Sequence, residues 1–452
     1  EGHKSADTVA RFFVDEKLQE RARKGVIWVD EAGMLGTKEV KKLLDLATHL
    51  KARVVLMLDN EQHRSVSRGG WFDVFARFAD VRTATVEGVK RQTGAYKEVV
   101  EHLNRQDWLG AFDRLEAMKA IHVSSRDQVT KLAAADYLAA RKRGEKVAVV
   151  AETHRQIAET TNHIRAGMRD AGELKADQKV DRLQSRQLTE AERKQTDSYR
   201  AGDVVEFHRS VKRLDRSVFE ARSRWEVVGH DPVGNVLVRS GITIRALPIR
   251  DASAFEVFER GKQEIAPGDL IRVTRNAKVS TQLDKVLAPF VKSLREPSHE
   301  VRNGQVFTVA RVGLTGSIIT TKGHIFPKSF GHITHAYCET SHSIQGSTVG
   351  RVVVLMTSDS GGASNVRHFN VGVARGANSV GLYTDSTEHI REVLKSDERE
   401  RSATAVVNEG VDRAQAAATE KARRVQEAAM HERAREAEAR RQEQERAKAR
   451  TL

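Results

Sequence analysis

The sequence predicts an α/β protein with two parallel-sheet blocks, a β-rich insertion in the second block and a charged helical tail. Short apolar runs alternate with helical patterns in residues 1–93, 146–172 and 330–398, and parallel strands need such helical crossovers. Between the last two ranges this alternation gives way to short strands separated by turn residues, a pattern typical of antiparallel sheet. A length of 452 residues also favours more than one domain.

These patterns divide the chain into five parts. We expect an incomplete first α/β domain (1–93), a helical connector (94–145), a second α/β domain (146–172 and 330–398), a linker with the β-rich insertion (173–329) and a charged, helical or disordered tail (399–452).

The first block begins with a strand, a helix and a second strand. "VIWV" (26–29) and "RVVLML" (53–58) are apolar runs of strand length, and Thr37 is a suitable N-cap for the helix between them. One face of that helix carries the apolar residues Val40, Leu43, Leu44, Ala47 and Leu50. Such a βαβ unit has its functional edge at the carboxyl ends of the strands, where Asp30 and Asp59 fall.

Later segments continue the alternation. We expect a helix at 71–78, a strand at 81–86, helices within 95–118 and 126–143, a strand at 146–153 and a helix at 155–168. Residues 171–200 are polar and strongly charged, which predicts a connector or exposed helices. After the insertion, the α/β pattern returns at the apolar segments 351–356, 370–375 and 380–385, followed by a helix to about 396. Within the insertion, "GDVVEF" and "GDLIRV" share an opening, which is weak evidence of an internal repeat.

Composition restricts the partners. The net charge of +14 and a pI near 9.8 favour polyanions such as nucleic acid. Cys338 is the only cysteine, which excludes an intrachain disulfide and favours a reducing, cytoplasmic setting. No apolar run is long enough for membrane insertion, and the chain has no recognisable targeting segment.

The acid pair Asp30 and Glu31 can serve nucleotide hydrolysis. One carboxylate after an apolar strand can hold hydrated Mg²⁺, and its neighbour can position the attacking water. Alternatively, the two acids cap the following turn. Gln62 follows the next strand, where an amide can touch a terminal phosphate without adding negative charge, although a plain loop residue is the alternative reading.

Two arginines and one polar loop complete the candidates. Arg91 and Arg375 can offer bidentate contacts to phosphate, or can be solvated surface charges. The stretch 334–354 packs small donors before an apolar strand and can contact phosphates or a nucleic-acid backbone, unless it is a polar turn. Its candidate residues are Thr340, Ser341, His342, Ser343, Gln345 and Gly346. Its histidines lack metal-ligand spacing with Cys338, so a zinc site is not expected.

In order, these segments resemble the motifs of a superfamily-one helicase, most closely the helicase part of MobF-type conjugative relaxases (TraI, TrwC and TraA-like proteins), which are RecD-like. "VIWVDEAGM" resembles motif II, "LDNEQHRSVSRGG" motif III, "VKRQ" motif IV, "ETSHSIQGSTVGRVVV" motif V and "NVGVARGANSVGLYTD" motif VI. The similarity covers roughly residues 5–395. It implies two RecA-like parallel-sheet domains, the first incomplete, and a β-rich SH3-like insertion in the second.

The resemblance also implies roles. Asp30 would bind Mg²⁺, Glu31 would activate water, Gln62 would sense the γ-phosphate of ATP, and Arg91 and Arg375 would be arginine fingers. The loop would couple nucleotide state to DNA contact: Gln345 and Gly346 would lie toward the nucleotide, and Thr340, Ser341, His342 and Ser343 toward DNA. The family moves 5′ to 3′ on single-stranded DNA and unwinds plasmid DNA, and a coupling protein of the conjugation system is a candidate partner.

Two departures limit what the chain does alone. No stretch fits G-x-x-x-x-G-K-[ST], the loop that holds nucleotide phosphates. Motif III reads "LDNEQ", with Asn60 after the acid and no glycine before it. We expect an N-terminally truncated helicase whose isolated chain lacks ATPase activity. The alternatives are a non-catalytic DNA-binding or recruitment module and a RecD-type repair helicase.

Overall fold

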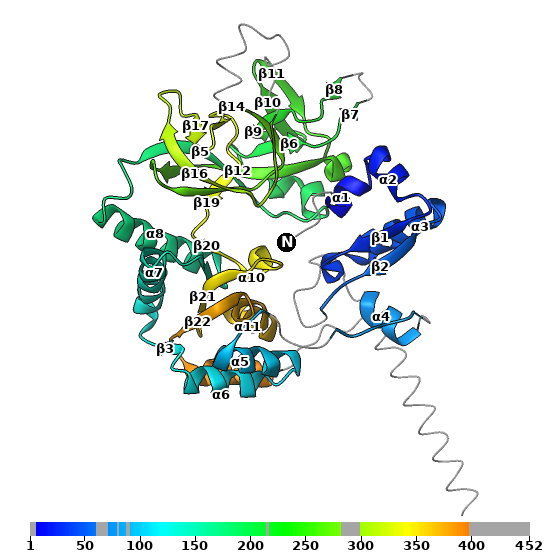
Figure 1. Ribbon diagram of the computed structural model, residues 1–452. Helices are drawn as coiled ribbons and strands as arrows, with labels where there is room; N and C mark the ends of the chain where they lie inside the picture. The colour runs from blue at the N-terminus through cyan, green and yellow to red at the C-terminus, as the bar shows by residue number, and fades with distance from the viewer. Residues whose placement is uncertain are drawn as a thin grey trace, which may run out of the picture. The chain divides into compact units, whose positions relative to one another are not determined.

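The computed structural model describes residues 6–59, 71–78, 81–86, 91–213, 217–281 and 299–396 (Figure 1). The chain divides into two compact units, the first comprising Glu1–Val89 with Leu394–Leu452 and the second Lys90–Val393. The predicted α/β class is confirmed, because parallel sheets occur together with antiparallel, β-rich regions. The predicted tail at 399–452 lies outside the described residues.

The first unit is built around a βαβ motif. Its elements are α1 (Val9–Phe12), α2 (Glu16–Ala22), β1 (Val26–Val29), the 3-10 helix η1 (Ala32–Met34), α3 (Thr37–His49), β2 (Arg53–Leu56) and α4 (Trp71–Phe78). Strands β1 and β2 are parallel, with Trp28 opposite Val55. Val40, Leu43 and Ala47 of α3 are buried, as the helical pattern predicts. The parallel pairing places the carboxyl ends of both strands at one edge.

Two local predictions for this unit are wrong. The N-cap of α3 is Gly36 rather than Thr37, because Gly36 has the extended backbone of a cap and its N–H donates to the Glu39 carboxylate at 2.9 Å. Residues 81–86 form no strand: all six are exposed, and no described strand pairs with them. Alternating apolar residues were therefore not enough to form a strand here, because no described neighbouring strand supplies hydrogen bonds.

A five-stranded parallel sheet forms the base of the second unit, with strand order β20-β4-β21-β22-β3. The strands are β3 (Ile121–Val123), β4 (Val147–Val150), β20 (Cys338–Glu339), β21 (Val349–Leu355) and β22 (Gly376–Thr384). The helices are α5 (Gly94–Asn104), α6 (Trp108–Ala117), α7 (Arg126–Lys142), α8 (His154–Asp170), α10 (Ser341–Ile344), α11 (Val366–Val373) and α12 (Thr387–Lys395). The sheet thus combines strands from before and after the insertion, and its edge strand β3 lies within 94–145, where only helices were expected.

Helices cover both faces of this sheet (Figure 1). Val353 and Leu355 of β21 share a buried cluster with side chains of α7 and α8. The intervening Val354 faces α11, where an added Cβ on Gly372 would lie 3.2 Å from its side chain. Burial on both faces explains why β21 reads as a continuous apolar run.

The apolar segment 370–375 is mostly helix and not a further strand. Helix α11 begins after Asn365, whose side chain accepts a hydrogen bond from the His368 N–H at 2.9 Å. Every residue of α11 from His368 to Val373 is buried. A short buried run of this kind cannot be assigned to a helix or a strand from its apolar residues alone.

The insertion contains two antiparallel sheets. The six-stranded sheet has the order β11-β10-β9-β6-β12-β5 and comprises β5 (Gln178–Ser185), β6 (Val204–Phe207), β9 (Arg224–His230), β10 (Val236–Ser240), β11 (Thr243–Ala246) and β12 (Phe255–Ile265). The seven-stranded sheet has the order β15-β14-β18-β17-β16-β13-β19 and comprises β13 (Leu270–Val273), β14 (Ala277–Thr281), β15 (His299–Val301), β16 (Val306–Val312), β17 (Ile318–Thr320), β18 (His324–Phe326) and β19 (Ile333–His335). Strands β7 (Val211–Lys212) and β8 (Val218–Phe219) form a separate hairpin.

Strand β5 lies in the segment expected to be only a charged connector. It pairs with β12 along its whole length at the edge of its sheet. Only Val180 and Leu183 of β5 are buried, so polar residues dominate its sequence. An edge strand exposed in this way carries too few apolar residues to be found from its pattern.

The shared opening "GD" marks the same local structure before one strand of each sheet, β6 in the first and β13 in the second. Gly202 and Gly268 both have positive φ, and both Asp203 and Asp269 are buried. Each aspartate accepts a hydrogen bond from the backbone N–H three residues before it, at 2.9 Å and 2.7 Å respectively. Each glycine N–H also donates to a strand carbonyl, Val227 or Val309, whose own N–H returns a bond to the aspartate carbonyl. The repeat therefore extends at least to this turn and its partner strand.

A buried ion pair joins the insertion to the parallel sheet unit. Arg165 of α8 donates to both carboxylate oxygens of Asp269 at 2.9 Å, and the Tyr337 hydroxyl donates to the same carboxylate at 2.9 Å. The Asp269 side chain is fully buried. This pair fixes the turn that opens the seven-stranded sheet against the helix that covers β20.

Candidate functional site

The acid pair lies where the βαβ pattern places it, directly after β1. Asp30 is exposed and accepts a hydrogen bond from the Glu31 N–H at 2.9 Å. Glu31 is half-buried and has φ 50° and ψ 39°, a left-handed conformation that costs a non-glycine residue about 1 kcal/mol or more. The Ala32 N–H donates to the Met57 carbonyl at 2.9 Å, which ties this turn to the chain after β2.

The hydrogen bonds of this turn test the alternative that Asp30 and Glu31 serve only as caps. Glu31 occupies the N-cap position of the short helix η1, but its side chain makes no capping hydrogen bond. The carboxylate of Asp30 binds the next backbone N–H and not a helix terminus. Helix capping therefore does not explain the Glu31 side chain, whereas Asp30 does bond the first N–H of the turn. Gln62, the predicted γ-phosphate sensor, lies outside the described residues.

In the second unit, Gln92 bonds the chain next to Arg91 to the chain around Arg375. The buried Gln92 amide donates to the carbonyls of Ala374 and Gly376 at 3.1 Å and 2.6 Å. These two hydrogen bonds hold the backbone on both sides of Arg375. Arg91 itself is exposed. Arg375 is buried, and its Nε donates to the Val371 carbonyl at 3.1 Å, which excludes the solvated-surface reading for this residue.

Tyr96 and Gly376 complete this arginine cluster. The buried Tyr96 hydroxyl donates to the Val373 carbonyl, and burial raises the pKa of Tyr96 above its usual range. The charges of Arg375 and Arg91 both act on this hydroxyl. Gly376 has no room for a side chain, because a Cβ would lie 2.6 Å from the Ser379 carbonyl oxygen. We refer to Arg91, Gln92, Tyr96, Arg375 and Gly376 as the arginine cluster.

The loop at 340–346 follows β20 at the carboxyl edge of the parallel sheet. Thr340 is the N-cap of α10 and accepts from the Ser343 N–H at 3.3 Å. His342 and Ser343 are exposed, and the Ser343 hydroxyl accepts from Arg272 at 2.8 Å. Burial, followed by the charge of Arg367, lowers the pKa of His342. Of the candidate side chains in this loop, the exposed ones of His342 and Ser343 are therefore those that a ligand can reach.

Ser341 and the end of the loop differ from that group. Ser341 is buried, and its hydroxyl lies 3.1 Å from Nδ1 of His368 instead of facing the surface. Gln345 is half-buried at the C-cap of α10, and Gly346 is exposed with φ 78°. A glycine tolerates that left-handed turn without strain, which accounts for the residue type at this position.

His368 is a site residue that sequence reasoning missed. Its Nε2 lies 3.1 Å from the Leu355 carbonyl, which can only accept, so Nε2 carries the proton. Nδ1 then accepts from the Ser341 hydroxyl. Burial lowers the pKa of His368 to about 4, so the ring is neutral near pH 7. The available signal was a histidine inside the apolar segment that leads to Arg375.

Helix α11 therefore connects the two groups of candidates. His368 near its start is bonded to Ser341 of the loop, and the carbonyls at its end are bonded to Gln92 and Tyr96 of the arginine cluster. Eight residues of α-helix span about 12 Å. Side-chain hydrogen bonds at both ends fix this helix between the loop and the cluster.

Glu152 is a second residue that the sequence did not single out. It follows β4, and its carboxylate accepts from the Thr357 N–H after β21 at 3.2 Å. Burial raises the pKa of Glu152. A buried carboxyl at the carboxyl edge of a parallel sheet lies where ligands of α/β proteins bind, but no sequence pattern marks it.

Metal and membrane features are limited in the described ranges. No group of three or more His, Cys, Asp or Glu side chains there is arranged to hold a metal ion. Burial raises the pKa of the Cys338 thiol, which keeps it protonated. Among the helices described, none is long and apolar enough to cross a membrane.

Comparison with known proteins gives one family match. Residues 2–126, which contain the acid pair and Arg91, match the AAA domain family. No curated protein matches the chain.

Solved structures with a general likeness to the chain are Pif1 helicases. Two coordinating Pif1 helicases that unwind forked double-stranded DNA give 10% identity and a TM-score of 0.40, with 85% of this chain and 74% of that chain covered. Pif1 from Candida albicans gives 14% identity and a TM-score of 0.35, with 86% and 81% covered. Bacteroides Pif1 bound to single-stranded DNA gives 13% identity and a TM-score of 0.32, with 82% and 73% covered. At these values the likeness assigns no residue roles.

Proposed function

We propose that this chain is the helicase portion of a MobF-type conjugative relaxase, which uses ATP to move 5′ to 3′ on single-stranded DNA and to unwind plasmid DNA. The observation that carries the proposal is the acid pair at the carboxyl end of β1, in a segment that matches the AAA domain family. In this proposal the two parallel sheets belong to RecA-like domains.

Asp30 suits Mg²⁺ as a hard oxygen ligand. One of its oxygens accepts from the Glu31 N–H, and the side chain is exposed at the strand end. Protein-bound Mg²⁺ keeps several waters and takes only one or two carboxylates together with substrate phosphates, so a larger acidic cluster is not required. Bound there with ATP, the ion would neutralise phosphate charge. Glu31, held beside Asp30, would accept a proton from the attacking water.

The remaining roles follow the same proposal. Gln62 would sense the γ-phosphate, and Arg91 and Arg375 would supply positive charge to the triphosphate. Their joint placement by Gln92 supports a shared role. Gln345 and Gly346 would relay the nucleotide state through the loop.

DNA contact is proposed for the exposed part of the loop, His342 and Ser343, with Thr340 shaping the turn and Ser341 holding it to α11. The net charge of +14 supports a polyanionic partner. We further propose cytoplasmic action and a coupling protein of the conjugation system as partner.

The 452 residues contain no G-x-x-x-x-G-K-[ST] loop, so we expect no ATP turnover from them alone. The direction of movement is tested by strand displacement in a form of the protein that also carries such a loop. Partial duplexes with a 5′ or a 3′ single-stranded tail are compared. We expect ATP-dependent displacement only from the 5′-tailed substrate; displacement from the 3′ tail alone would contradict the proposed polarity.

A further inference from the structure

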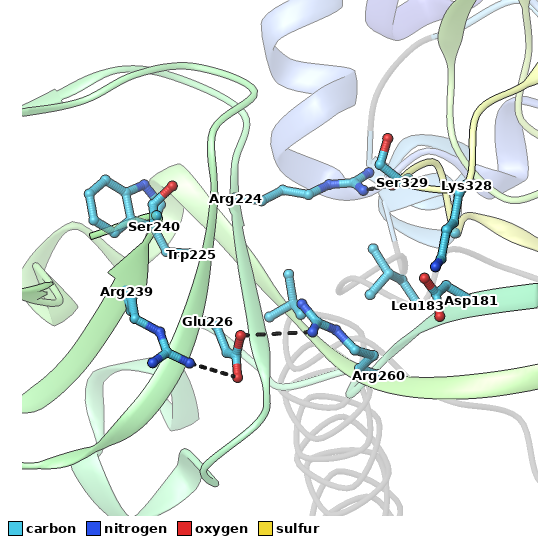
Figure 2. Close-up of a pocket in the computed structure, with 13 residues that line it drawn as sticks. Asp181, Leu183, Arg224, Trp225, Glu226, Arg239, Ser240, Arg260, Lys328 and Ser329 are labelled. Atoms are coloured by element: carbon cyan, nitrogen blue, oxygen red, sulfur yellow. Dashed lines mark hydrogen bonds and ion pairs between the residues drawn. The ribbon is translucent and has the colours of Figure 1, made fainter. Parts of the chain in front are cut away.

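A basic hollow lies on one face of the six-stranded sheet, on the side opposite its main core (Figure 2). It has a volume of about 360 Å³. Residues of β5, β6, β9, β10 and β12 line it, together with the loop at 328–331. We propose that this hollow binds the backbone of single-stranded nucleic acid, a site separate from the loop at 340–346; this inference rests on the proposed function.

Three cations border the hollow with few competing bonds. The side chains of Arg239 and Arg260 are 48% and 52% exposed, and they share one carboxylate, Glu226, at 3.6 Å and 3.8 Å. These separations exceed hydrogen-bond length, and exposed pairs of this kind contribute little. Lys328 is exposed and makes no ion pair within 4.0 Å in the part of the chain described, although its charge acts on Asp181 across the hollow. A phosphate can therefore replace Glu226 as partner at small cost.

The other charged residues of the hollow are already engaged. Arg224 donates to the Phe330 carbonyl at 3.0 Å and so holds the 328–331 loop against the sheet. Asp181 pairs with Lys262, which offsets its charge. Three available cations and one carboxylate leave a net charge of about +2, which favours an anion.

The floor of the hollow is apolar. Leu183 and Val204 line it, and they form a small buried cluster with Phe258. A basic rim over an apolar floor suits a single strand, whose phosphates meet the cations while an unstacked base rests on the floor. The stacked bases of a duplex are not available for such a contact.

A second hollow extends the basic surface along β12. It has a volume of about 190 Å³, shares Arg260 with the first and is bordered by Arg186 and Arg200. Arg186 is bonded to Asp203 at 2.6 Å, whereas Arg200 is exposed; the exposed Glu259 also lines this hollow, so its net charge is about +1. Adjoining hollows that share a cation fit a polyanion with repeated charges better than a single small anion.

The test compares two triple variants of the chain that remove the same charge. R239A/R260A/K328A alters the hollow, and K212A/R311A/K322A removes three exposed cations of the insertion that do not line it. Binding to a fluorescent 20-mer of thymidylate and to a 20-mer duplex is followed by anisotropy over a range of salt concentrations. Thermal melting checks that both variants are folded.

We expect the hollow variant to bind the single strand about tenfold more weakly and to lower the salt slope by about 2, because each lost single-strand phosphate contact removes about 0.7. The control variant should lose less than about threefold. The inference would be overturned if both variants lost the same affinity for the single strand, or if the hollow variant lost as much affinity for the duplex as for the single strand. Neither result would contradict the proposed function. Failure of the unaltered chain to bind any oligonucleotide at low salt would also contradict the proposed DNA function.

Discussion

Gln92 donates a hydrogen bond of 2.6 Å to the backbone carbonyl of Gly376, 284 positions further along the chain. The same amide group donates to the Ala374 carbonyl, so one buried side chain is bonded to the backbone before and after Arg375. Because Arg91 directly precedes Gln92, this contact fixes the two predicted phosphate-binding arginines in one cluster. The relationship between them thus depends on a glutamine to which neither motif assigned a role.

Replacement of Gln92 by alanine should destabilise the second unit. The variant leaves two carbonyls without their donor in a buried place, which costs about 1–3 kcal/mol. Urea unfolding followed by circular dichroism measures the change. The control is Gln128→Ala, an exposed position on α7, which should stay within about 0.5 kcal/mol of the unaltered chain. Equal stability of the two variants would contradict a clamping role for Gln92.

Replacement of Asp269 by asparagine should detach the insertion from the parallel sheet unit. The loss removes the bidentate partner of the buried Arg165 guanidinium, which keeps only Asp177, and breaking a buried pair costs up to about 3–5 kcal/mol. Asp113→Asn serves as control, because Asp113 pairs with Arg391 at 2.8 Å but is 58% exposed. The control should lose less than about 1 kcal/mol. A comparable loss in both would show that the buried pair does not anchor the insertion.

Asp269 also predicts behaviour in acid. Burial opposes its ionisation, but His335 and Arg165 outweigh burial and hold the pKa of Asp269 well below its usual range. The unfolded carboxyl has a pKa near 3.9. The folded state therefore gains stability from this group above about pH 4, and loses it as the pH falls further. Asp269→Asn should lack this part of the acid transition.

His368 predicts a separate loss of stability in mild acid. Burial lowers its pKa to about 4, below the value near 6.5 of an exposed histidine, so the unfolded state binds more protons between these values. Stability should be full above about pH 6.5 and fall by about 3 kcal/mol on acidification to pH 4. Replacement by glutamine should remove most of this dependence. The exposed His163→Gln variant of α8 should retain it; the same pH profile in both variants would contradict the assignment.

The sequence predicted the fold where apolar periodicity and burial agree. Strands β1, β2, β4 and β21 all lie in the expected segments, although burial is extensive only in β4 and β21, while Val26 and Trp28 of β1 are exposed. The sequence-based prediction failed for α11, β5 and residues 81–86, each for a different physical reason. The apolar segment of α11 is too short to distinguish a buried helix from a strand, β5 is a polar edge strand, and 81–86 has apolar residues without a partner strand among the described ones.

At the candidate site, the order of the motifs identified the candidate residues but did not predict their burial or their hydrogen-bond partners. The acid pair after β1 followed from the βαβ pattern alone. Burial of Arg375 and Ser341 did not, because it depends on Gln92, Tyr96 and His368, which lie far away in the sequence. Short-range patterns carry no information about such long-range hydrogen bonds.

The central claim is that Glu31 activates water for ATP hydrolysis. It is tested most directly by steady-state ATP turnover of Glu31→Gln in a form of the protein that carries a phosphate-binding loop, with single-stranded DNA binding measured in parallel. We expect turnover to fall by at least about 100-fold, as for loss of a positioned general base, while DNA affinity stays within about twofold. Unchanged turnover in this variant, with DNA binding intact, would contradict the account.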